Sequence, residues 1–198
     1  MIKFEHTEVR GFPHALRGMR NPMDSWSKSD STFTEYGACI GLKDQDLCLR
    51  LIAAGPEHAK FLRQIICWVD ITAPRFWWTE FDTYRVGVEK NSCSTMHRIM
   101  AKPFTDEDFA ADALPGGVIA DLNALRSAYH ETEDPDEKKR VWRRLIERLP
   151  QSYLQKRTVM MSYAAIRTMC HQRAGHKLQE WHDFIKWAHA LPRNWLFD

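Results

Sequence analysis

The sequence predicts an α+β fold that is rich in helices and carries a small mixed or antiparallel sheet. Most of the chain from residue 44 onward shows the apolar spacing of amphipathic helices. Only short segments have the β-branched or extended character of strands. No internal repeat or low-complexity segment interrupts this pattern. We therefore expect a single domain over residues 1–198, with residues 1–37 as an N-terminal extension of a core over 38–198.

The composition is ordinary for a globular protein and argues against several functional classes. Apolar residues make up 44% of the chain and charged residues 27%. The net charge of +2 provides no strong field, so we expect no direct binding to nucleic acid. No stretch approaches about 18 consecutive apolar residues, and the N-terminus lacks the apolar segment of a signal peptide. We expect no attachment to a membrane.

The cysteines point to a reducing compartment. Their number, five, is odd and no two form a CxxC pair. This argues against a disulfide framework and against a structural zinc site, and it favours the cytosol. The unusual figure is eight tryptophans. Such rings fill a core, cover a subunit interface or stack on a planar ligand, and composition alone does not choose between these.

The N-terminal extension is rich in glycine, proline, serine and charge. A short strand is expected over residues 1–9, turns at 11–13 and 20–22, and a loop over 24–30. Loops of this length in compact domains are often functional or disordered.

The central segment predicts helices separated by one buried strand. Asp44 or Asp46 can cap the first helix, Gly55 can end it, and Pro56 suits the first position of the next. The expected elements are helices over 44–54, from 56 toward 65 and over 73–84, a strand over 65–71, and a polar loop over 91–94.

The C-terminal half predicts mainly amphipathic helices. Thr105 resembles a helix cap, because acidic residues follow it in the first turn. The other expected elements are helices over 118–129, 136–149, 162–173 and 177–191, and an extended segment over 155–161.

Polar and aromatic residues are densest between residues 55 and 98. Tyr84 and Arg85 lie at an expected helix end before a serine-rich loop. Loop N–H groups and hydroxyls beside an arginine suit a phosphate. Amphipathic helices commonly look like this, so the aromatic residues can equally be core and the charges a solvated face.

A second cluster of polar residues lies over residues 171–189. His176 and Glu180 can share a helix face, but the HExxH spacing of zinc hydrolases is missing, and we predict no metal site. Cys93, in the polar loop, is a conceivable nucleophile, although no base can be assigned to it and an unreactive thiol fits as well.

The order of motifs between residues 49 and 98 resembles a known family. Residues 55–61 resemble a helix that starts with a Glu-His pair, 66–71 the strand that follows, and 80–85 a run that ends in an Arg-His-Arg triplet. Cys93 and Ser94 lie near the place of a serine that follows the triplet. This layout is similar to the flavin-dependent thymidylate synthases, which methylate dUMP with FAD and methylenetetrahydrofolate.

The C-terminal third resembles the same family, and the N-terminus resembles a second group. Leu149-Pro150 and Thr158 match a Leu-Pro element and a following Thr. Residues 162–173 resemble a helix that carries an Asn and ends in an Arg, and Leu178-Gln179 an Ala-Gln pair. The Gly-Met-Arg-Asn-Pro element at residues 18–22 resembles phage-type proteins of this size.

The resemblance implies the thymidylate synthase-complementing-like fold and a set of site residues. Arg173 and Ser94 are the implied catalytic residues. The resemblance also implies NADPH and methylenetetrahydrofolate as co-substrates, a homotetramer with sites at subunit interfaces, and a place in the cytoplasm of a bacterium or phage-infected host. The implied FAD-binding residues are His58, Thr83, Tyr84, Arg85 and Ser162, and the implied nucleotide-binding residues are Cys93, Ser94, His97, Arg98, Arg173 and Gln179.

The chain departs from the family pattern at several of these positions. Thr83 and Tyr84 replace two members of the triplet, and Ser162 replaces the helix Asn. The arginine that would hold the nucleotide phosphate is Thr95 or Met96, with His97 or Arg98 as substitutes. Loss of phosphate-binding arginines weakens the positioning of a substrate.

A flavin needs a broad apolar slot and cationic groups for its diphosphate. Trp77, Trp78 and Tyr84 are expected as planar walls, and Arg85 with His58 as the charge. We expect His58 and Arg85 to line one cleft.

Three functional hypotheses follow from the sequence. The first is flavin-dependent one-carbon transfer to a pyrimidine nucleotide of the dUMP type. The second is a nucleotide-binding protein of the same fold that has lost flavin chemistry and sequesters or senses a nucleotide. The third is an interaction protein whose tryptophans cover an oligomer interface.

Overall fold

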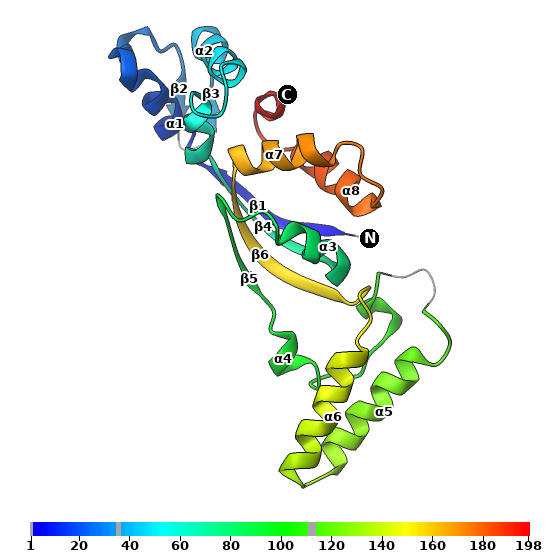
Figure 1. The fold of residues 1–198 in the computed structure, drawn as a ribbon. Helices are drawn as coiled ribbons and strands as arrows, with labels where there is room; N and C mark the ends of the chain where they lie inside the picture. The colour runs from blue at the N-terminus through cyan, green and yellow to red at the C-terminus, as the bar shows by residue number, and fades with distance from the viewer. Residues whose placement is uncertain (1, 35–36, 111–113) are drawn as a thin grey trace. The chain divides into compact units, whose positions relative to one another are not determined.

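The computed structural model describes residues 2–34, 37–110 and 114–198. Its larger sheet has four antiparallel strands in the order β1-β4-β6-β5, and a smaller antiparallel sheet pairs β2 with β3. Helices occupy most of the remaining chain (Figure 1). The predicted helix-rich α+β fold with a small sheet is confirmed. The strands are β1 (Lys3–Arg10), β2 (Thr32–Thr34), β3 (Gly37–Cys39), β4 (Ile66–Pro74), β5 (Val88–Ser92) and β6 (Leu154–Ser162).

The helices are of two kinds, and none of those described is both long and apolar enough to cross a membrane. The α-helices are α1 (Phe12–Arg20), α2 (Leu42–Ala53), α3 (Arg75–Phe81), α4 (Thr95–Arg98), α5 (Val118–Glu131), α6 (Pro135–Arg148), α7 (Tyr163–Arg173) and α8 (Gln179–Ala188). The 3₁₀ helices are η1 (Asn21–Met23), η2 (Trp26–Lys28), η3 (Ala59–Gln64), η4 (Asp106–Asp108) and η5 (Asn194–Phe197).

The chain divides into two compact units. The prediction of one domain with an N-terminal extension is not tested by this division and stays a prediction. Unit 1 consists of Met1–Lys3, Ile71–Thr83 and Asn91–Arg157, and unit 2 of Phe4–Asp70, Tyr84–Lys90 and Thr158–Asp198.

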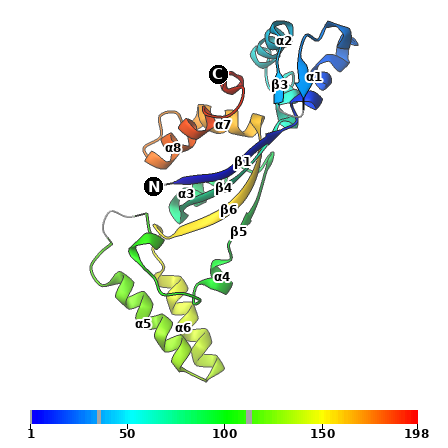
Figure 2. The same ribbon diagram turned by 180° about the vertical axis from the view of Figure 1, so that it is seen from behind.

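Unit 1 contains a helical hairpin with its own apolar core. α5 and α6 lie side by side in both views of the chain (Figure 2). The carboxylate of Asp134 accepts a hydrogen bond from the N–H of Asp136, and Pro135 takes the first helical position. Both features favour a helix start here. The buried core residues are Ile99, Met100, Phe104, Phe109, Leu122, Leu145 and Leu149.

The aromatic residues of α3 fill a second part of the core of unit 1. Trp77 and Trp78 are 0% and 1% exposed, and their ring centroids lie 4.9 Å apart. Phe81 is also fully buried beside them. The indole N–H of Trp78 donates to the carbonyl of Gln155 at 2.9 Å. The prediction that Trp77 and Trp78 form walls of a ligand site is therefore wrong, because both rings are packed inside the protein.

In unit 2, α8 packs against β1 through aromatic rings. The ring of Phe4 on β1 stacks on Trp187 at 4.8 Å, with an angle of 7° between the planes. Tyr163 is fully buried at the start of α7, and its hydroxyl donates to the carbonyl of Pro192 at 2.7 Å. Burial raises the pKa of Tyr163, so this phenol stays neutral and holds the C-terminal segment against α7.

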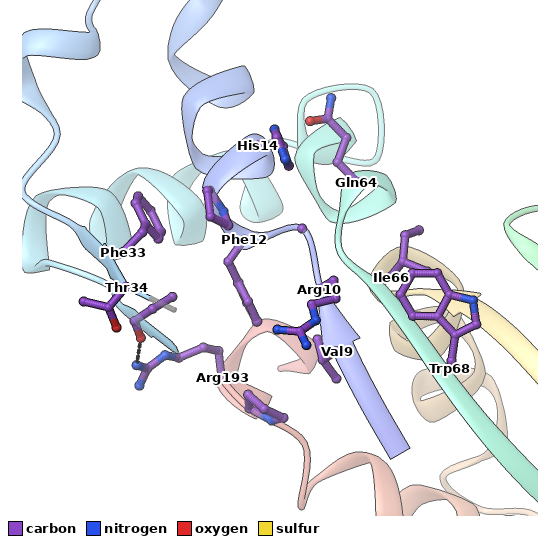
Figure 3. Close-up of a pocket in the computed structure, with 14 residues that line it drawn as sticks. Val9, Arg10, Phe12, His14, Phe33, Thr34, Gln64, Ile66, Trp68 and Arg193 are labelled. Carbon is purple, nitrogen blue, oxygen red and sulfur yellow. Dashed lines mark hydrogen bonds between the residues drawn. The ribbon is translucent and has the colours of Figure 1, made fainter. Parts of the chain in front are cut away.

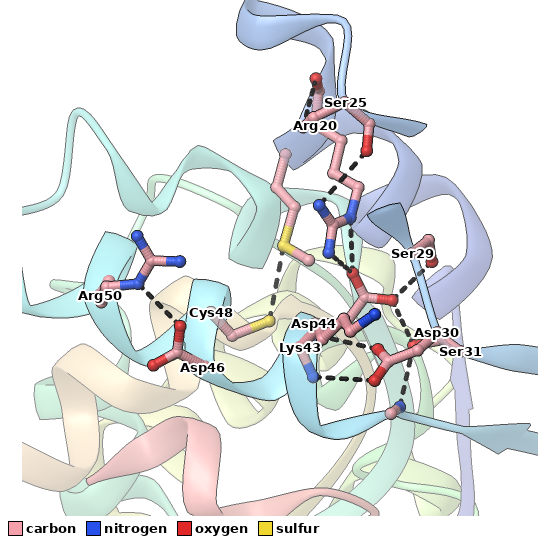
Figure 4. Close-up of polar contacts among 12 residues, drawn as sticks. Arg20, Ser25, Ser29, Asp30, Ser31, Lys43, Asp44, Asp46, Cys48 and Arg50 are labelled. Carbon is pink, nitrogen blue, oxygen red and sulfur yellow. Dashed lines mark hydrogen bonds and ion pairs between the residues drawn. The ribbon is translucent and has the colours of Figure 1, made fainter. Parts of the chain in front are cut away.

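A buried ion pair joins α1 to α2 in unit 2 (Figure 4). The guanidinium of Arg20 lies 2.6 Å from the carboxylate of Asp44, and the two side chains are 5% and 0% exposed. The hydroxyls of Ser29 and Ser31 donate to the other carboxylate oxygen of Asp44 at 2.6 and 2.5 Å. Burial alone would raise the pKa of Asp44, but the hydrogen bonds from Ser29, Ser31 and Arg20 outweigh it and lower that pKa.

The N-terminus of α2 is capped from outside the helix by Asp30. The N–H groups of Lys43 and Asp44 donate to the Asp30 carboxylate at 2.9 and 3.1 Å. The Lys43 bond in particular lowers the pKa of Asp30. Gly41 permits this approach, because a Cβ there would lie only 2.2 Å from the Asp30 carboxyl carbon. Residues 29 and 30 belong to the predicted loop over 24–30, and residue 31 follows it. Contacts with α2 therefore hold this part of the chain in place.

Several local predictions differ from the structure. The turns expected at 11–13 and 20–22 flank a helix, α1, because Pro13 suits the first turn of a helix and Gly11, at φ 103°, turns the chain into it. The helix expected from Pro56 is the short 3₁₀ helix η3, because β4 starts at Ile66 and leaves room for little more.

The polar loop expected over 91–94 begins inside an edge strand of the larger sheet. Asn91 and Ser92 complete β5, and the N–H of Ser162 donates to the carbonyl of Gly87 where this strand begins. Polar side chains are common in exposed edge strands. The polarity of these residues therefore led to the prediction of a loop instead of a strand. The helix expected at Thr105 is the single turn η4, with the predicted capping residue in place.

The Asp44 contacts predict a large loss of stability in Asp44→Asn. The change leaves the Arg20 charge buried without a counter-charge, which costs about 3–5 kcal/mol. Urea unfolding followed by circular dichroism at pH 7 measures it. Because the pKa of Asp44 is lowered in the folded state, its stabilising effect is present above the unfolded pKa of about 3.9 and is lost as the pH falls through the folded value.

Asp46→Asn is the matched control. Asp46 pairs with Arg50 on the exposed face of the same helix, with side chains 65% and 68% exposed, so its loss costs less than about 1 kcal/mol. Equal losses in the two variants would contradict a structural role for the buried pair.

Candidate functional site

Two residues predicted to act in the site, Tyr84 and Arg173, meet in unit 2. The guanidinium Nε–H of Arg173 donates to the hydroxyl of Tyr84 at 2.9 Å, and this hydroxyl donates to the side-chain oxygen of Gln172 at 3.0 Å. Arg173 is the last residue of α7, and Tyr84 lies between α3 and β5. The contact therefore brings together residues from distant parts of the sequence.

Two aromatic rings lie close to the same arginine. The guanidinium carbon of Arg173 lies 4.7 Å from the ring centroid of Trp181 and 5.5 Å from that of Tyr84. The two rings are 5.9 Å apart in an edge-to-face arrangement. Cation–π contacts of this kind contribute about 0.5–2 kcal/mol each and restrict the rotamers of the arginine. A preorganised guanidinium is suited to a planar carbonyl or an anionic group.

Ser94 lines a small cavity of about 260 Å³ in unit 1. Its hydroxyl accepts a hydrogen bond from the N–H of His97 at 3.3 Å and so caps α4. Arg75 and Gln155, which the predictions of site residues missed, line the same cavity. The guanidinium of Arg75 donates to the carbonyl of Leu149 at 3.3 Å, and the Gln155 amide donates to the Cys93 carbonyl at 3.2 Å.

The other predicted nucleotide-binding residues are more exposed. Cys93 is exposed, and its N–H donates to the carbonyl of Lys156 at 2.9 Å. His97 and Arg98 lie exposed on α4. Gln179 donates to the carboxylate of Asp183 one helical turn later at 3.1 Å, a contact typical of an exposed helix surface.

The predicted FAD-binding residues fall into two groups. His58 and Arg85 are exposed, and no hydrogen bond or ion pair joins their side chains in the described part of the chain. The cleft predicted between them stays a prediction. Thr83 and Ser162 are engaged with the backbone: Thr83 donates to the carbonyl of Glu80 at 2.7 Å, and Ser162, 3% exposed, caps α7 by accepting from Ala165.

The buried cysteines are unsuited to nucleophilic chemistry. Burial raises the pKa of the Cys48 and Cys67 thiols to about 12 and that of Cys170 to about 11. Thiols with such values stay protonated near neutral pH. Among residues 2–34, 37–110 and 114–198, no three His, Cys, Asp or Glu side chains are grouped as metal ligands.

Unit 2 also contains a larger cavity, of about 830 Å³, that none of the predicted site residues lines (Figure 3). Its walls come from the end of β1, the start of α1, the small β2–β3 sheet, the start of β4 and the segment before η5. The residues that line it are Val9, Arg10, Gly11, Phe12, Pro13, His14, Phe33, Thr34, Ala38, Gln64, Ile66, Trp68, Pro192 and Arg193.

Comparison with known proteins shows which fold these units build. No model of a known protein family and no curated protein matches the sequence. A solved structure of thymidylate synthase X from Helicobacter pylori with FAD and dUMP does match. It is 18% identical, with a TM-score of 0.68, over 100% of this chain and 97% of that chain.

The chain has the fold of a flavin-dependent thymidylate synthase. A second structure of that enzyme from Helicobacter pylori, complexed with FAD and dUMP, matches with a TM-score of 0.69 at 18% identity and the same coverage. The similarity spans both units, so the fold expected from the motifs is confirmed. At this level of identity it shows the fold alone.

The Tyr84 contacts predict a loss of stability and order in Tyr84→Phe. The change keeps the ring beside Trp181 and removes the hydroxyl that accepts from Arg173 and donates to Gln172. We expect about 1 kcal/mol less stability and faster hydrogen exchange of the Arg173 Nε–H, measured by urea unfolding and by NMR.

Tyr129→Phe is the control, because its hydroxyl makes no hydrogen bond to a described residue. Unchanged exchange of Arg173 in Tyr84→Phe would show that the hydroxyl does not hold this arginine.

Proposed function

We propose that the protein binds a pyrimidine nucleotide of the dUMP type and FAD, and transfers a one-carbon unit to the base. The observation that carries the proposal is the structural similarity over the whole chain to an enzyme solved with both compounds. The arginine held by Tyr84 and Trp181 supports it, since Arg173 lies at the helix end where the resemblance expects a nucleotide-binding arginine.

Each residue has a defined task in this proposal. Arg173 is the group that polarises a carbonyl of the pyrimidine, where negative charge develops during the reaction. Its restraint by Tyr84 means that little reorganisation is needed as that charge forms. Ser94 and Gln179 are proposed to orient the nucleotide, with His97 and Arg98 near its phosphate. Cys93 is proposed as a neighbouring contact rather than a nucleophile.

The residues that fit a flavin best are Arg85 and His58. Both are exposed, and neither side chain donates to another residue in the described ranges, so a cationic and a hydrogen-bonding group are available for a diphosphate. When bound, FAD would supply hydride chemistry, with NADPH as the source of electrons and methylenetetrahydrofolate as the proposed one-carbon donor. Thr83, Tyr84 and Ser162 fit less well, because their hydroxyls already serve contacts within unit 1 or unit 2.

These occupied hydroxyls favour a second candidate function. Where the family pattern has two basic residues, this chain has Thr83 bonded to a backbone carbonyl and Tyr84 bonded to Gln172 and Arg173. A protein of this fold that binds a nucleotide without flavin, and sequesters or senses it, would keep Arg173 and lose most of the cationic triplet. Both functions are proposed for a homotetramer, with sites completed by partner subunits, in the cytoplasm of a bacterium or phage-infected host.

The flavin proposal predicts a yellow protein. Freshly purified protein should show the absorbance of oxidised flavin, and calorimetry with added FAD should give saturable binding. Arg85→Ala should weaken the affinity for FAD at least about tenfold, because a charged hydrogen bond to the diphosphate is lost. Arg143→Ala is the control, since Arg143 pairs with Glu147 on the exposed face of α6. Colourless protein without FAD binding would exclude the first function and leave the second.

The nucleotide proposal predicts a requirement for Arg173. Calorimetry should show binding of dUMP to the wild type, weakened at least about tenfold in Arg173→Lys, because an ammonium cannot reproduce the planar fork of the guanidinium. Circular dichroism confirms that the variant is folded. Wild-type protein that binds neither dUMP nor another nucleotide would exclude both functions.

A further inference from the structure

We infer that the cavity at the start of α1 is a second ligand site, for a small aromatic anion: a planar ring that carries a carboxylate or a phosphate. We call it the α1 cavity, and its walls are the residues given above for the cavity of about 830 Å³ in unit 2. That volume lies within the range of about 300–1,000 Å³ typical of small-molecule sites. It contains none of the residues assigned to FAD or the pyrimidine nucleotide, so the inference goes beyond the proposed function.

The ionisable side chains among the described lining residues of the α1 cavity are all of basic type. Arg10, His14 and Arg193 line it, and none of the described lining residues is a carboxylate. Arg193 donates to the backbone carbonyl of Ala38, a neutral acceptor, and forms no ion pair with a described residue (Figure 3). Arg10 pairs with Glu8, which lies outside the cavity walls. An anion in the cavity would therefore meet positive charge without a competing carboxylate on the walls described.

The backbone at the same wall also favours an anion. The N-cap residue of α1 is Gly11, which has no side chain to cap the helix, and the first turn of α1 carries no acidic residue. The N-terminal end of a helix carries partial positive charge and attracts anions. Gly11 is required for the shape of this wall, because a Cβ there would lie 2.1 Å from the carbonyl oxygen of Gln64.

Aromatic rings provide the second half of the site. Phe33 and Trp68 line the cavity and remain 38% and 40% exposed, unlike the fully buried Trp77, Trp78 and Trp181. Large rings left exposed in a concave site are suited to stack on a planar ligand. Gln64, which lines the same cavity, has a side-chain amide that can bond the edge of such a ring.

Arg193 is held at the cavity in an uncommon backbone conformation. Its φ and ψ are 58° and 40°, in the left-handed region that non-glycine residues rarely adopt. Such positions persist where the surroundings impose them and concentrate at ligand-binding sites. Here the conformation directs Arg193 toward the small sheet, where it bonds the Ala38 carbonyl beside Thr34 (Figure 3).

The test compares each of two anions with its uncharged counterpart. Calorimetry on the full chain uses AMP against adenosine and indole-3-acetate against indole, so that one arm reports phosphate and the other carboxylate. We expect at least one anion to bind at least about tenfold more tightly than its neutral partner. Arg193→Ala should remove the preference for the anion. Trp68→Ala should weaken the binding of both the anion and its neutral counterpart. Trp68→Phe, which keeps a ring, should restore most of the affinity.

Arg17→Ala is the control, because Arg17 is an exposed arginine of α1 that does not line the cavity. Thermal unfolding checks that each variant is folded, and FAD and dUMP binding by Arg193→Ala separates this site from the proposed function. The inference is overturned if neither anion binds, if neutral and charged partners bind equally, or if folded Arg193→Ala binds as the wild type does.

Discussion

The buried pair of Arg20 and Asp44 is the constraint on which the N-terminal part of unit 2 depends. A lone charge in that position would be strongly destabilising, and the hydroxyls of Ser29 and Ser31 also donate to the Asp44 carboxylate. The geometry of the pair ties the end of α1 to the first turn of α2 and fixes the segment that leads into β2 (Figure 4). Phe33 is the middle residue of β2. The shape of the α1 cavity therefore rests on an ion pair that does not line it.

Local patterns in the sequence were sufficient to predict those helices and strands that are stabilised by their own residues. The helices α5, α6 and α7 have amphipathic spacing, and Asp134 and Ser162 cap two of them as polar residues do at helix starts. α1 was concealed because Pro13 is typical both of a turn and of a first helical turn. β5 was concealed because its polar residues are held by pairing with a strand far away in the sequence, a tertiary effect that a local pattern does not contain.

In the candidate site too, some features could be predicted from the sequence and others depend on tertiary packing. Tyr84 and Arg173 could be named from motif order, and the structure joins them. That Trp77 and Trp78 are core, while Trp68 is left exposed, depends on which face of each element meets a neighbour. The α1 cavity could not be read from the sequence at all, because Arg10 and Arg193 come from opposite ends of the chain. The high tryptophan content was the one hint in the sequence, but composition alone could not show which tryptophan is exposed in a cavity.

The altered triplet sets the physical difference between the two proposed functions. With Thr83 and Tyr84 neutral and bonded internally, Arg85 is the one guanidinium left in that segment to attract a diphosphate. Phosphate binding by arginine is charge-assisted and roughly twice as strong as a neutral hydrogen bond, so its loss must be offset by contacts to the flavin ring. Trp77 and Trp78 cannot supply these contacts, because both lie in the core. In the proposed functions, flavin binding would therefore depend on Arg85 and His58, whereas nucleotide binding would depend on Arg173, which Tyr84 and Trp181 already contact.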